Sequence, residues 1–394
     1  MSFASRPRQA SIAVVMATHN QARLLERALQ GIGRQTRPPV QTVVVDDGST
    51  DETAAVLAAA RLPGLAVLRQ ANQGVSVARN AGLAAASAEF VLFLDDDDSL
   101  EPSALERLGN LQAAEPLADL VHADWDFVSD TSSRCLPQSS ELGPEPLRTL
   151  IRRNPLALHC VLARRQALLD LGGFRPRGGA LEDWELWLRL AVAGACFRHL
   201  PEVLAHYHWR PGSGSSRAEA MHEVRLAVLA EQRVLLGNRL SPTDWEEALA
   251  TAWMDHAVNQ WRADNLETAA VALRQAERHE PGLLARWDSY YRLWFADYLE
   301  ALSDRGPADE AQRWRLRERR MTALLGRLSA SHAVRSAAAW AQAQALREAG
   351  QPWPSLIEAG RAARYRPVTL AQVRALRLVA RSLLDALSWQ RSRS

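Results

Sequence analysis

Four consecutive aspartates, Asp95 to Asp98, follow directly on an apolar segment in AEFVLFLDDDDSLEP. Adjacent carboxylates repel one another, so such a run is either a solvated turn or a site that takes up a cation. The apolar residues predict a buried central strand, which places the first aspartates close to a core. An alternating pair such as Asp95 and Asp97 presents hard oxygen ligands for Mg²⁺ or Mn²⁺, which in turn bind phosphate oxygens. The position therefore favours a divalent cation with a diphosphate over a solvated turn.

Two earlier apolar runs also end in polar clusters. VVMATHN ends in Thr18 to Asn20, and VVVDDGSTD ends in Asp46 to Asp51. Each cluster alone can be a turn that caps the following helix, because Ser, Thr and Asp side chains accept the first free amides. In an open α/β sheet, however, ligands bind outside the carboxyl ends of the strands. Three polar strand ends therefore predict a ligand crevice as well as helix caps.

The elements that position these residues alternate along the first half of the chain. Short β-branched runs and helical patterns follow one another, which predicts βαβ units on a largely parallel sheet. We expect strands at 11–18, 41–47, 65–70 and 90–96, with helices at about 21–35, from about 51, and at about 74–86. After the stretch PGSGSS the strand signals end and long amphipathic segments follow. We therefore predict an α/β domain over residues 1–215 and a helical domain over residues 216–394.

A second acidic cluster lies in ALEDWELWLRL, residues 180–190. As structure alone, this is an amphipathic helix with Leu181, Trp184, Leu188 and Leu190 facing the core and with acids at its positive N-terminal end. The pattern taken by itself favours this structural interpretation.

Composition excludes several classes of function. The 394 residues carry 47 basic and 45 acidic side chains, a net charge of +2, so no global field indicates a nucleic-acid partner. Every basic residue is arginine, which excludes a P-loop lysine, Schiff-base chemistry and a lysine general base. The three cysteines show no ligand spacing, which fits a reducing compartment. No signal core or transmembrane run is evident, so we expect a cytoplasmic protein, with contact at the inner face of the membrane left open.

Four segments in combination resemble glycosyltransferase family 2, the enzymes of the GT-A fold. They are SIAVVMATHNQARLLERALQGIGRQT, QTVVVDDGSTDETAAVL, NQGVSVARNAGLAAASAEFVLFLDDDD and LGGFRPRGGALEDWELWLRLAVAG. The resemblance covers roughly Ser11 to Trp209. It implies a mixed, mostly parallel sheet flanked by helices, followed here by an all-α domain. It also implies inverting transfer of a sugar from a nucleoside diphosphate sugar to an acceptor hydroxyl, with Mn²⁺ or Mg²⁺.

The resemblance assigns the nucleotide pocket residue by residue. The first strand end contributes Thr18, His19 and Asn20, preceded by Ala17 where the family commonly has proline. Asp47, supported by Asp46, would read the base, which suits the imide of a UDP- or dTDP-linked donor. The remaining residues implied near the base, ribose and diphosphate are Arg79, Asn80, Gly82 and Asp96. Without the resemblance, Arg79 is an arginine on the solvent side of a helix.

The metal and the base follow from the same resemblance. Asp97 would hold the metal, with Asp95 as a second candidate, and His208 would complete the shell, with His206 as its alternative. Asp183 would be the general base, within hydrogen-bond reach of the acceptor hydroxyl, and Glu182 is the backup. The Gly and Ser residues that follow His208 would let a loop close over the donor.

The chain also departs from part of the family. It lacks the Q-x-x-R-W motif and the transmembrane helices of processive synthases, so we expect single transfer to a glycan, lipid-linked or protein acceptor. The acceptor segment, about 119–155, shows no readable specificity. One alternative is a non-catalytic nucleotide-sugar-binding or scaffold protein that acts through its helical domain. A dinucleotide-dependent oxidoreductase is weaker, because no G-x-G-x-x-G follows the first strand.

The helical half contains two related segments. AWMDHAVNQWRADNLETAAVALRQAERHEP and AAAWAQAQALREAGQPWPSLIEAGRAARYRP share a helix, break, helix and proline pattern that resembles tetratricopeptide units. A degenerate helical bundle explains the pattern nearly as well. Most tryptophans, including Trp253, Trp261, Trp287 and Trp294, are expected in the core. A concave helical surface could hold a protein partner or an acceptor chain.

Overall fold

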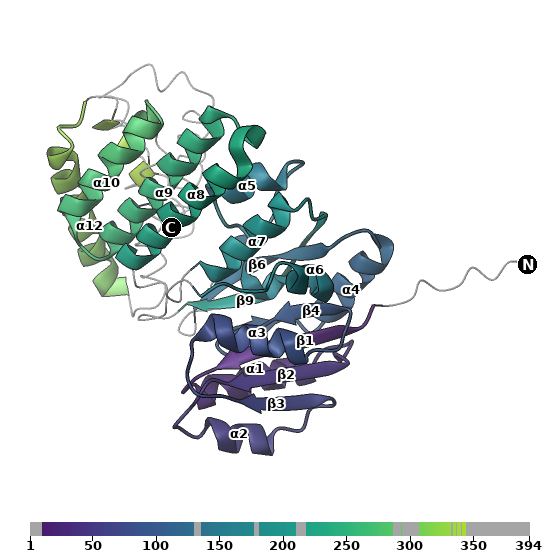
Figure 1. Cartoon of the computed structure of the whole chain (residues 1–394). Coiled ribbons are helices and arrows are strands. Elements are labelled where there is room, and N and C mark those ends of the chain that lie inside the picture. The colour runs from purple at the N-terminus through teal and green to yellow at the C-terminus, as the bar shows by residue number, and fades with distance from the viewer. Residues whose placement is uncertain are drawn as a thin grey trace, which may run out of the picture. The chain divides into compact units, whose positions relative to one another are not determined.

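The computed structural model shows an α/β unit followed by a helical unit (Figure 1). The structure describes residues 10–129, 135–176, 181–209, 218–286, 293, 307–331, 334–335, 337–339 and 341–343. The strands are β1 (Ile12–Thr18), β2 (Gln41–Asp46), β3 (Leu65–Arg69), β4 (Phe90–Phe93), β5 (Ser99–Leu100), β6 (Leu120–Ser129), β7 (Cys135–Gln138), β8 (Val161–Arg164) and β9 (Phe197–Trp209). The helices of the α/β unit are α1 (Ala22–Gly33), α2 (Thr53–Ala59), α3 (Val75–Ala85), α4 (Ala104–Ala114), α5 (Pro146–Arg152), η1 (Leu158–Cys160), α6 (Arg165–Asp170), α7 (Glu182–Val192), α8 (Ala218–Leu236) and η3 (Gly237–Arg239). All four expected strands and the three helices between them are present.

The nine strands form one mixed sheet in the order β3-β2-β1-β4-β8-β6-β9-β5, with β7 paired to β6. Parallel pairing joins β3, β2, β1 and β4, as well as β6 and β9. The pairs β4–β8, β6–β8, β5–β9 and β6–β7 are antiparallel. This mixed sheet flanked by helices confirms the expected fold class.

The core of the sheet follows from its apolar strands. β1, β2 and β4 are buried on both faces, as central parallel strands must be when helices cover them. Helix α3 packs on β1 and β2, and a side chain at Gly82 would bring a Cβ to 2.4 Å from Val15 Cγ1. The glycine therefore lets α3 approach the sheet closely, next to the carboxyl ends of the strands.

The boundary between the two units lies between Leu240 and Ser241, later than the boundary expected after residue 215. Helix α8 belongs to the α/β unit because Arg225 on this helix donates to the Arg152 carbonyl and lies 5.4 Å from the Trp184 ring. A Gly/Ser-rich stretch marks a flexible composition, but it does not show where the last packed helix of a domain ends. No helix among the described residues is long and apolar enough to cross a bilayer.

The helical unit contains α9 (Pro242–Arg262), α10 (Leu266–His279), η4 (Leu283–Ala285) and α12 (Pro307–Arg327). Helices α9 and α10 lie side by side, and α10 also packs on α12. Trp261 is fully buried and Trp253 packs at the edge of this core, while Trp287 and Trp294 lie outside the described residues. The first tetratricopeptide-like segment is a helix pair, as expected. Most of the second lies outside the described residues, so the tetratricopeptide assignment stays a prediction.

Candidate active site

Three polar strand ends meet at one edge of the sheet. Thr18, at the end of β1, pairs in register with Asp46 at the end of β2. On the other side of β1, the Leu94 amide just after β4 donates to the Val15 carbonyl at 3.0 Å. The aspartate run therefore begins beside the ends of β1 and β2, where the sequence predicted a crevice.

The end of β1 contributes one buried and two exposed side chains. Thr18 is buried and its hydroxyl donates to Asp96 Oδ2 at 2.5 Å. Asn20 has a left-handed backbone (φ 55°) and its Oδ1 accepts from the Thr50 amide at 2.8 Å. The His19 ring lies 3.1 Å from the side-chain amides of Asn20 and Asn72. The exposed His19 and Asn20 side chains are thus preorganised at the mouth of the site.

Asp46, at the end of β2, stabilises the turn that follows. It is 1% exposed and accepts from the Ser49 amide at 2.8 Å. Gly48 has φ 79°, and a Cβ there would lie 2.8 Å from the Asn72 backbone nitrogen. Asp51 caps two helices, because it accepts from the Thr53 amide and the Ala22 amide, both at 3.1 Å. Asp51 therefore acts as a helix cap, as one interpretation of DDGSTD predicted.

Asp47 is likewise committed to backbone groups. Its Oδ1 accepts from Gln70 Nε2 at 2.8 Å and the Gln73 amide at 3.0 Å, and its Oδ2 accepts from the Gly74 amide at 2.8 Å. The side chain is 4% exposed. It therefore anchors the loop that leads into α3, and a base-reading role would have to share these oxygens.

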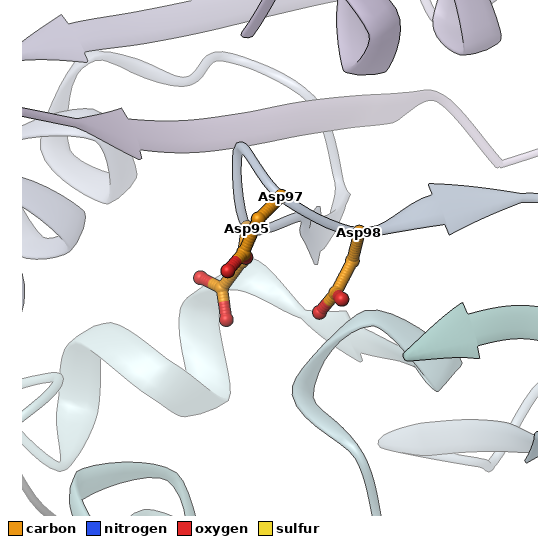
Figure 2. A group of neighbouring side chains, drawn as sticks. All are labelled: Asp95, Asp97 and Asp98. Atoms are coloured by element: carbon orange, nitrogen blue, oxygen red, sulfur yellow. The ribbon is translucent and has the colours of Figure 1, made fainter. Parts of the chain in front are cut away.

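Oxygen atoms of Asp95, Asp97 and Asp98 gather within 4.8 Å of one another (Figure 2). A hard divalent cation prefers ligands of this kind, so three carboxylates at this spacing fit Mg²⁺ or Mn²⁺. The expected alternating pair, Asp95 and Asp97, is partly exposed, whereas Asp98 is 1% exposed. The Arg27 guanidinium donates to the Asp97 carbonyl at 2.7 Å and fixes the loop. These three carboxylates are therefore the candidate cation-binding group.

Asp98 ties the acidic loop to two other segments. Its Oδ1 accepts from the His208 amide at 2.9 Å, and its Oδ2 lies 2.9 Å from His159 Nδ1. Burial disfavours the charged imidazolium, but the adjacent Asp98 carboxylate more than offsets this and raises the pKa of His159. Asp98 therefore positions β9 and η1 beside the acidic group.

The two candidate histidines on β9 are both engaged. The His208 ring lies 2.8 Å from Ser99 Oγ, and His208 is not one of the three residues whose ligand atoms gather. His206 contacts Asp126 at 2.6 Å and Glu101 at 3.0 Å through its two ring nitrogens. The hydrogen bond to Asp126 raises the pKa of His206 despite partial burial. His208 contacts the acidic group through its backbone amide, which donates to Asp98. The Gly and Ser loop expected to close over the donor lies outside the described residues.

Arg79 links the two acidic clusters. Its guanidinium donates to Asp95 Oδ1 at 2.5 Å and to Glu182 Oε1 at 2.7 Å. The side chain is buried rather than on a solvent-facing helix surface. Burial disfavours the charge, but the Asp95 and Glu182 carboxylates more than compensate and raise the pKa of Arg79. A permanent cation thus joins the end of β4 to the start of α7.

Asn80, the neighbour of Arg79 in the ARNAG segment, holds the loop before α7. Its Nδ2 donates to the Phe174 carbonyl at 2.7 Å, and its Oδ1 accepts from the Phe174 amide at 2.8 Å. A Cβ at Gly173 would collide with this side chain at 2.2 Å. Both hydrogen-bonding groups of Asn80 are engaged with protein, so the structure directs them to the loop rather than to the nucleotide pocket.

Asp183 lies in the first turn of α7. Asn154 Nδ2 donates to its Oδ2 at 3.0 Å, and Leu181, directly before the helix, adopts a left-handed backbone with φ 59°. Burial, with the nearby Glu182 carboxylate second, raises the pKa of Asp183 to about 6. A carboxylate of this kind is still mostly ionised at neutral pH and is a stronger base than an ordinary aspartate.

Sequence reasoning missed Asn154, which contacts this carboxylate, and the ion pair that fixes α7 to the preceding loop. Helix α7 is buried almost all round, and Glu185, expected only as an acid of the first turn, is 0% exposed and pairs with Arg189 at 2.9 Å. Arg189 also donates to the carbonyls of Leu171 and Gly173, which fixes the preceding loop. An acid and an arginine four residues apart on one helix were a readable signal. No sequence signal indicated Asn154, because its partner Asp183 lies 29 residues away.

The chain is similar in sequence to known proteins. Residues 13–168 match the family model described as Glycosyl transferase family 2. An uncharacterized glycosyltransferase of Nostoc sp. is 36% identical over 138 residues, covering 34% of this chain and 42% of that protein. A PGL/p-HBAD biosynthesis glycosyltransferase of Mycobacterium bovis is 28% identical over 257 residues, covering 63% of this chain and 96% of that protein.

Two solved structures share the fold. Residues 1–349 of S. aureus TarS, crystallised with UDP-GlcNAc, align with a TM-score of 0.52 and 22% identity over 74% of this chain and 88% of that one. The mannosyltransferase PcManGT from Pyrobaculum calidifontis, in complex with GDP-Man and Mn²⁺, aligns with a TM-score of 0.50 and 20% identity over 75% of this chain and 86% of that one.

Proposed function

We propose, from the match of residues 13–168 to the family model described as Glycosyl transferase family 2, that the protein is a metal-dependent, inverting glycosyltransferase. It moves one sugar at a time from a nucleoside diphosphate sugar, UDP- or dTDP-linked, to an acceptor hydroxyl in glycan or glycoconjugate biosynthesis. One observation carries the proposal. The carboxylate of Asp183, with its raised pKa, lies in the first turn of α7. Its neighbour Glu182 is joined through Arg79 to Asp95 in the cation-binding group.

The nucleotide binds, in this proposal, across the ends of β1 and β2. Thr18, His19 and Asn20 line the pocket, Asp47 supported by Asp46 reads the base, and Asp96 lies by the ribose. His19 and Asn20 are exposed, and their side-chain nitrogens are within reach of one another. Solved enzymes of similar fold that hold UDP-GlcNAc or GDP-Man support this class of donor.

The cation is held by Asp95 and Asp97, with His208 nearby. A bound Mn²⁺ or Mg²⁺ supplies positive charge that stabilises the departing diphosphate. Arg79 contributes a second positive charge beside Asp95 and orients this carboxylate. The ion pairs of Arg79 with Asp95 and Glu182 therefore preorganise the charged groups of the site for the nucleotide.

Asp183 takes the proton from the acceptor hydroxyl. Inversion requires attack from the face of the sugar opposite the diphosphate, so the base must lie away from the phosphate site and within hydrogen-bond reach of the acceptor. Asn154 orients the carboxylate through Oδ2. Glu182 is the weaker candidate, because its carboxylate is already paired with Arg79 at 2.7 Å.

The substitution Asp183→Asn tests the assignment. It keeps the shape of the side chain and can still accept from Asn154, but removes the basicity. We expect Mn²⁺-dependent hydrolysis of the preferred nucleotide sugar, with water as acceptor, to fall by ~10²–10⁴. UDP affinity measured by calorimetry should remain near that of the parent.

The parent protein supplies the controls. A panel of UDP-, dTDP- and GDP-sugars identifies the donor by thermal stabilisation in the presence of Mn²⁺. Full hydrolysis in a folded Asp183→Asn protein would move the base to Glu182 or elsewhere. A parent that binds a nucleotide sugar but never turns it over would instead indicate a non-catalytic binding protein.

A further inference from the structure

Three partly exposed aromatic side chains pack together on one face of β6 and β9. The ring of Trp125 lies 4.7 Å from that of Phe127 and 6.2 Å from that of Tyr207, and Phe127 and Tyr207 are 5.4 Å apart. All three contacts are edge-to-face. Trp125 and Phe127 are alternate residues of β6, and Tyr207 is paired with Phe127 in register on β9. We call these three side chains the aromatic platform.

One end of the aromatic platform is connected to the proposed base. Trp125 Nε1 donates to the Pro155 carbonyl at 2.9 Å. The residue before this proline, Asn154, donates to Asp183 Oδ2 at 3.0 Å. Two hydrogen bonds and one peptide unit therefore separate the Trp125 ring from the carboxylate that accepts the acceptor proton.

The other end of the aromatic platform is connected to the acidic group. The Tyr207 ring stacks on the ring of His159, with centroids 6.3 Å apart and planes 24° from parallel. His159 pairs with Asp98 at 2.9 Å, and the residue after Tyr207, His208, donates its amide to the same carboxylate. Direct contacts therefore link the aromatic platform to the proposed base on one side and to the cation-binding group on the other.

The chemistry of the aromatic platform indicates what it binds. The three residues are partly exposed, which sets them apart from fully buried aromatics of the same unit such as Trp184 and Trp187. Ligand sites combine aromatic surface with a few oriented polar groups. A pyranose presents an apolar face of C–H bonds with partial positive charge, which is complementary to the negative face of an aromatic ring. Hydroxyls at the rim of the sugar remain free to meet the carboxylates.

We propose that Trp125, Phe127 and Tyr207 form the acceptor subsite, and that the acceptor stacks a sugar ring on them while its hydroxyl reaches Asp183. This inference rests on the proposed function for the identity of the base. It assigns a carbohydrate acceptor to the chain. The Trp125 hydrogen bond to Pro155 couples the stacked ring to the Asn154 amide, and so sets the distance between the acceptor and its base.

The experiment uses the full-length protein with UDP and Mn²⁺, and three sugar probes: methyl β-D-glucopyranoside, methyl β-D-galactopyranoside and methyl α-D-mannopyranoside. Saturation-transfer NMR reports which ring protons contact the protein. We expect signals from the C–H face of at least one glycoside on the parent. Trp125→Ala should weaken its affinity by about 10-fold, which corresponds to about 1.4 kcal/mol of stacking. Trp125→Phe, which keeps a ring and loses only the donor to Pro155, should retain most of the signal.

Two further variants keep the test decisive if Trp125→Ala does not fold. Phe127→Leu retains apolar volume but removes a ring, and should also weaken glycoside binding. Leu117→Ala removes an 84% exposed apolar side chain just before β6 and is the matched surface control. Glycoside binding that is absent from the parent, or unchanged in both Trp125→Ala and Phe127→Leu, overturns the proposal.

UDP binding separates this inference from the proposed function. A parent that binds UDP with Mn²⁺ but gives no glycoside signal refutes the acceptor subsite alone. A parent that binds no nucleotide refutes the proposed function, and glycoside signals lost in Trp125→Ala would then still identify the aromatic platform as a sugar-binding site.

Discussion

The ends of β2 and β4 lie on either side of β1 and carry similar acidic sequences, yet their carboxylates face different partners. At the end of β2, Asp46 and Asp47 are buried and accept from amides of the following loops. At the end of β4, Asp95 and Asp97 are partly exposed and gather with a third carboxylate. The first pair organises the chain, whereas the second is available to a cation.

The difference lies in where the compensating positive charge comes from. Asp46 obtains its share from the Ser49 amide of the turn that follows β2. Asp47 obtains its share from the Gln70 side chain and from the Gln73 and Gly74 amides in the loop before α3. Asp95 instead pairs with the Arg79 guanidinium, and in the proposed function a cation from solution would balance the remaining charge of the group. The role of an acidic run therefore depends on which groups its carboxylates contact. Three of the four aspartates at the end of β4 are partly exposed.

The largest effect should come from Asp97→Ala, at the end of β4. Removing a direct metal ligand should weaken the Mn²⁺-dependent part of UDP binding by at least ~100-fold, since even supporting residues of metal sites cost up to that factor. The free energy of unfolding should change little, because the carboxylate is partly exposed among like charges. Calorimetric titration of UDP with and without Mn²⁺ measures it. Equal UDP affinity with and without the metal in the parent contradicts the assignment.

The matched change at the end of β2, Asp47→Ala, should lower stability in addition to weakening recognition of the base. It leaves the amides of Gln73 and Gly74 without their acceptor, so the free energy of unfolding should fall by about 2 kcal/mol. Urea unfolding followed by circular dichroism provides the measurement. If stability holds and only nucleotide affinity drops, Asp47 is a binding residue first and the contrast between the two strand ends is wrong.

The smallest effect concerns pH. Since the pKa of Asp183 is raised to about 6, hydrolysis should be constant above that pH and fall by about tenfold per unit below it, as the base becomes protonated. The effect on folding has the opposite sign. Protonation relieves the burial of the charge, so this residue favours the folded state as pH falls from about 6 toward the value for an unfolded aspartate. The pH profile of Asp183→Asn should lack both trends; a low-pH loss of activity that persists in this variant would assign it to another group.

The sequence predicted the parallel part of the sheet well because its signals are local. The strands at β1, β2, β3 and β4 are continuous apolar runs bounded by turn residues, and each element is specified within a few positions. The boundary after α8 was missed, since it depends on Arg225 reaching Arg152 across 73 residues. Composition near residue 215 carries no information about such a contact.

The same distinction applies to the candidate site. The positions of the acidic residues could be read from the sequence, and the grouping of Asp95 with Asp97 follows from their alternation. Their partners could not, because Arg79 lies 103 residues from Glu182, and Asn154 lies 29 residues from Asp183. A tertiary fold creates these pairs, and no period or spacing in one sequence indicates them.

The four aspartates after β4 face different neighbours: Arg79 for Asp95, Thr18 for Asp96, the shared acidic group for Asp97, and His159 for Asp98. A substitution at one position therefore affects a different set of neighbours from a substitution at the next. The loss or gain of a single aspartate codon differs from a substitution. It would shift the carboxylates in the run by one place relative to their neighbours, although the amino-acid sequence would look almost the same. In genetic terms, we expect a repeat that tolerates some substitutions but no change of length.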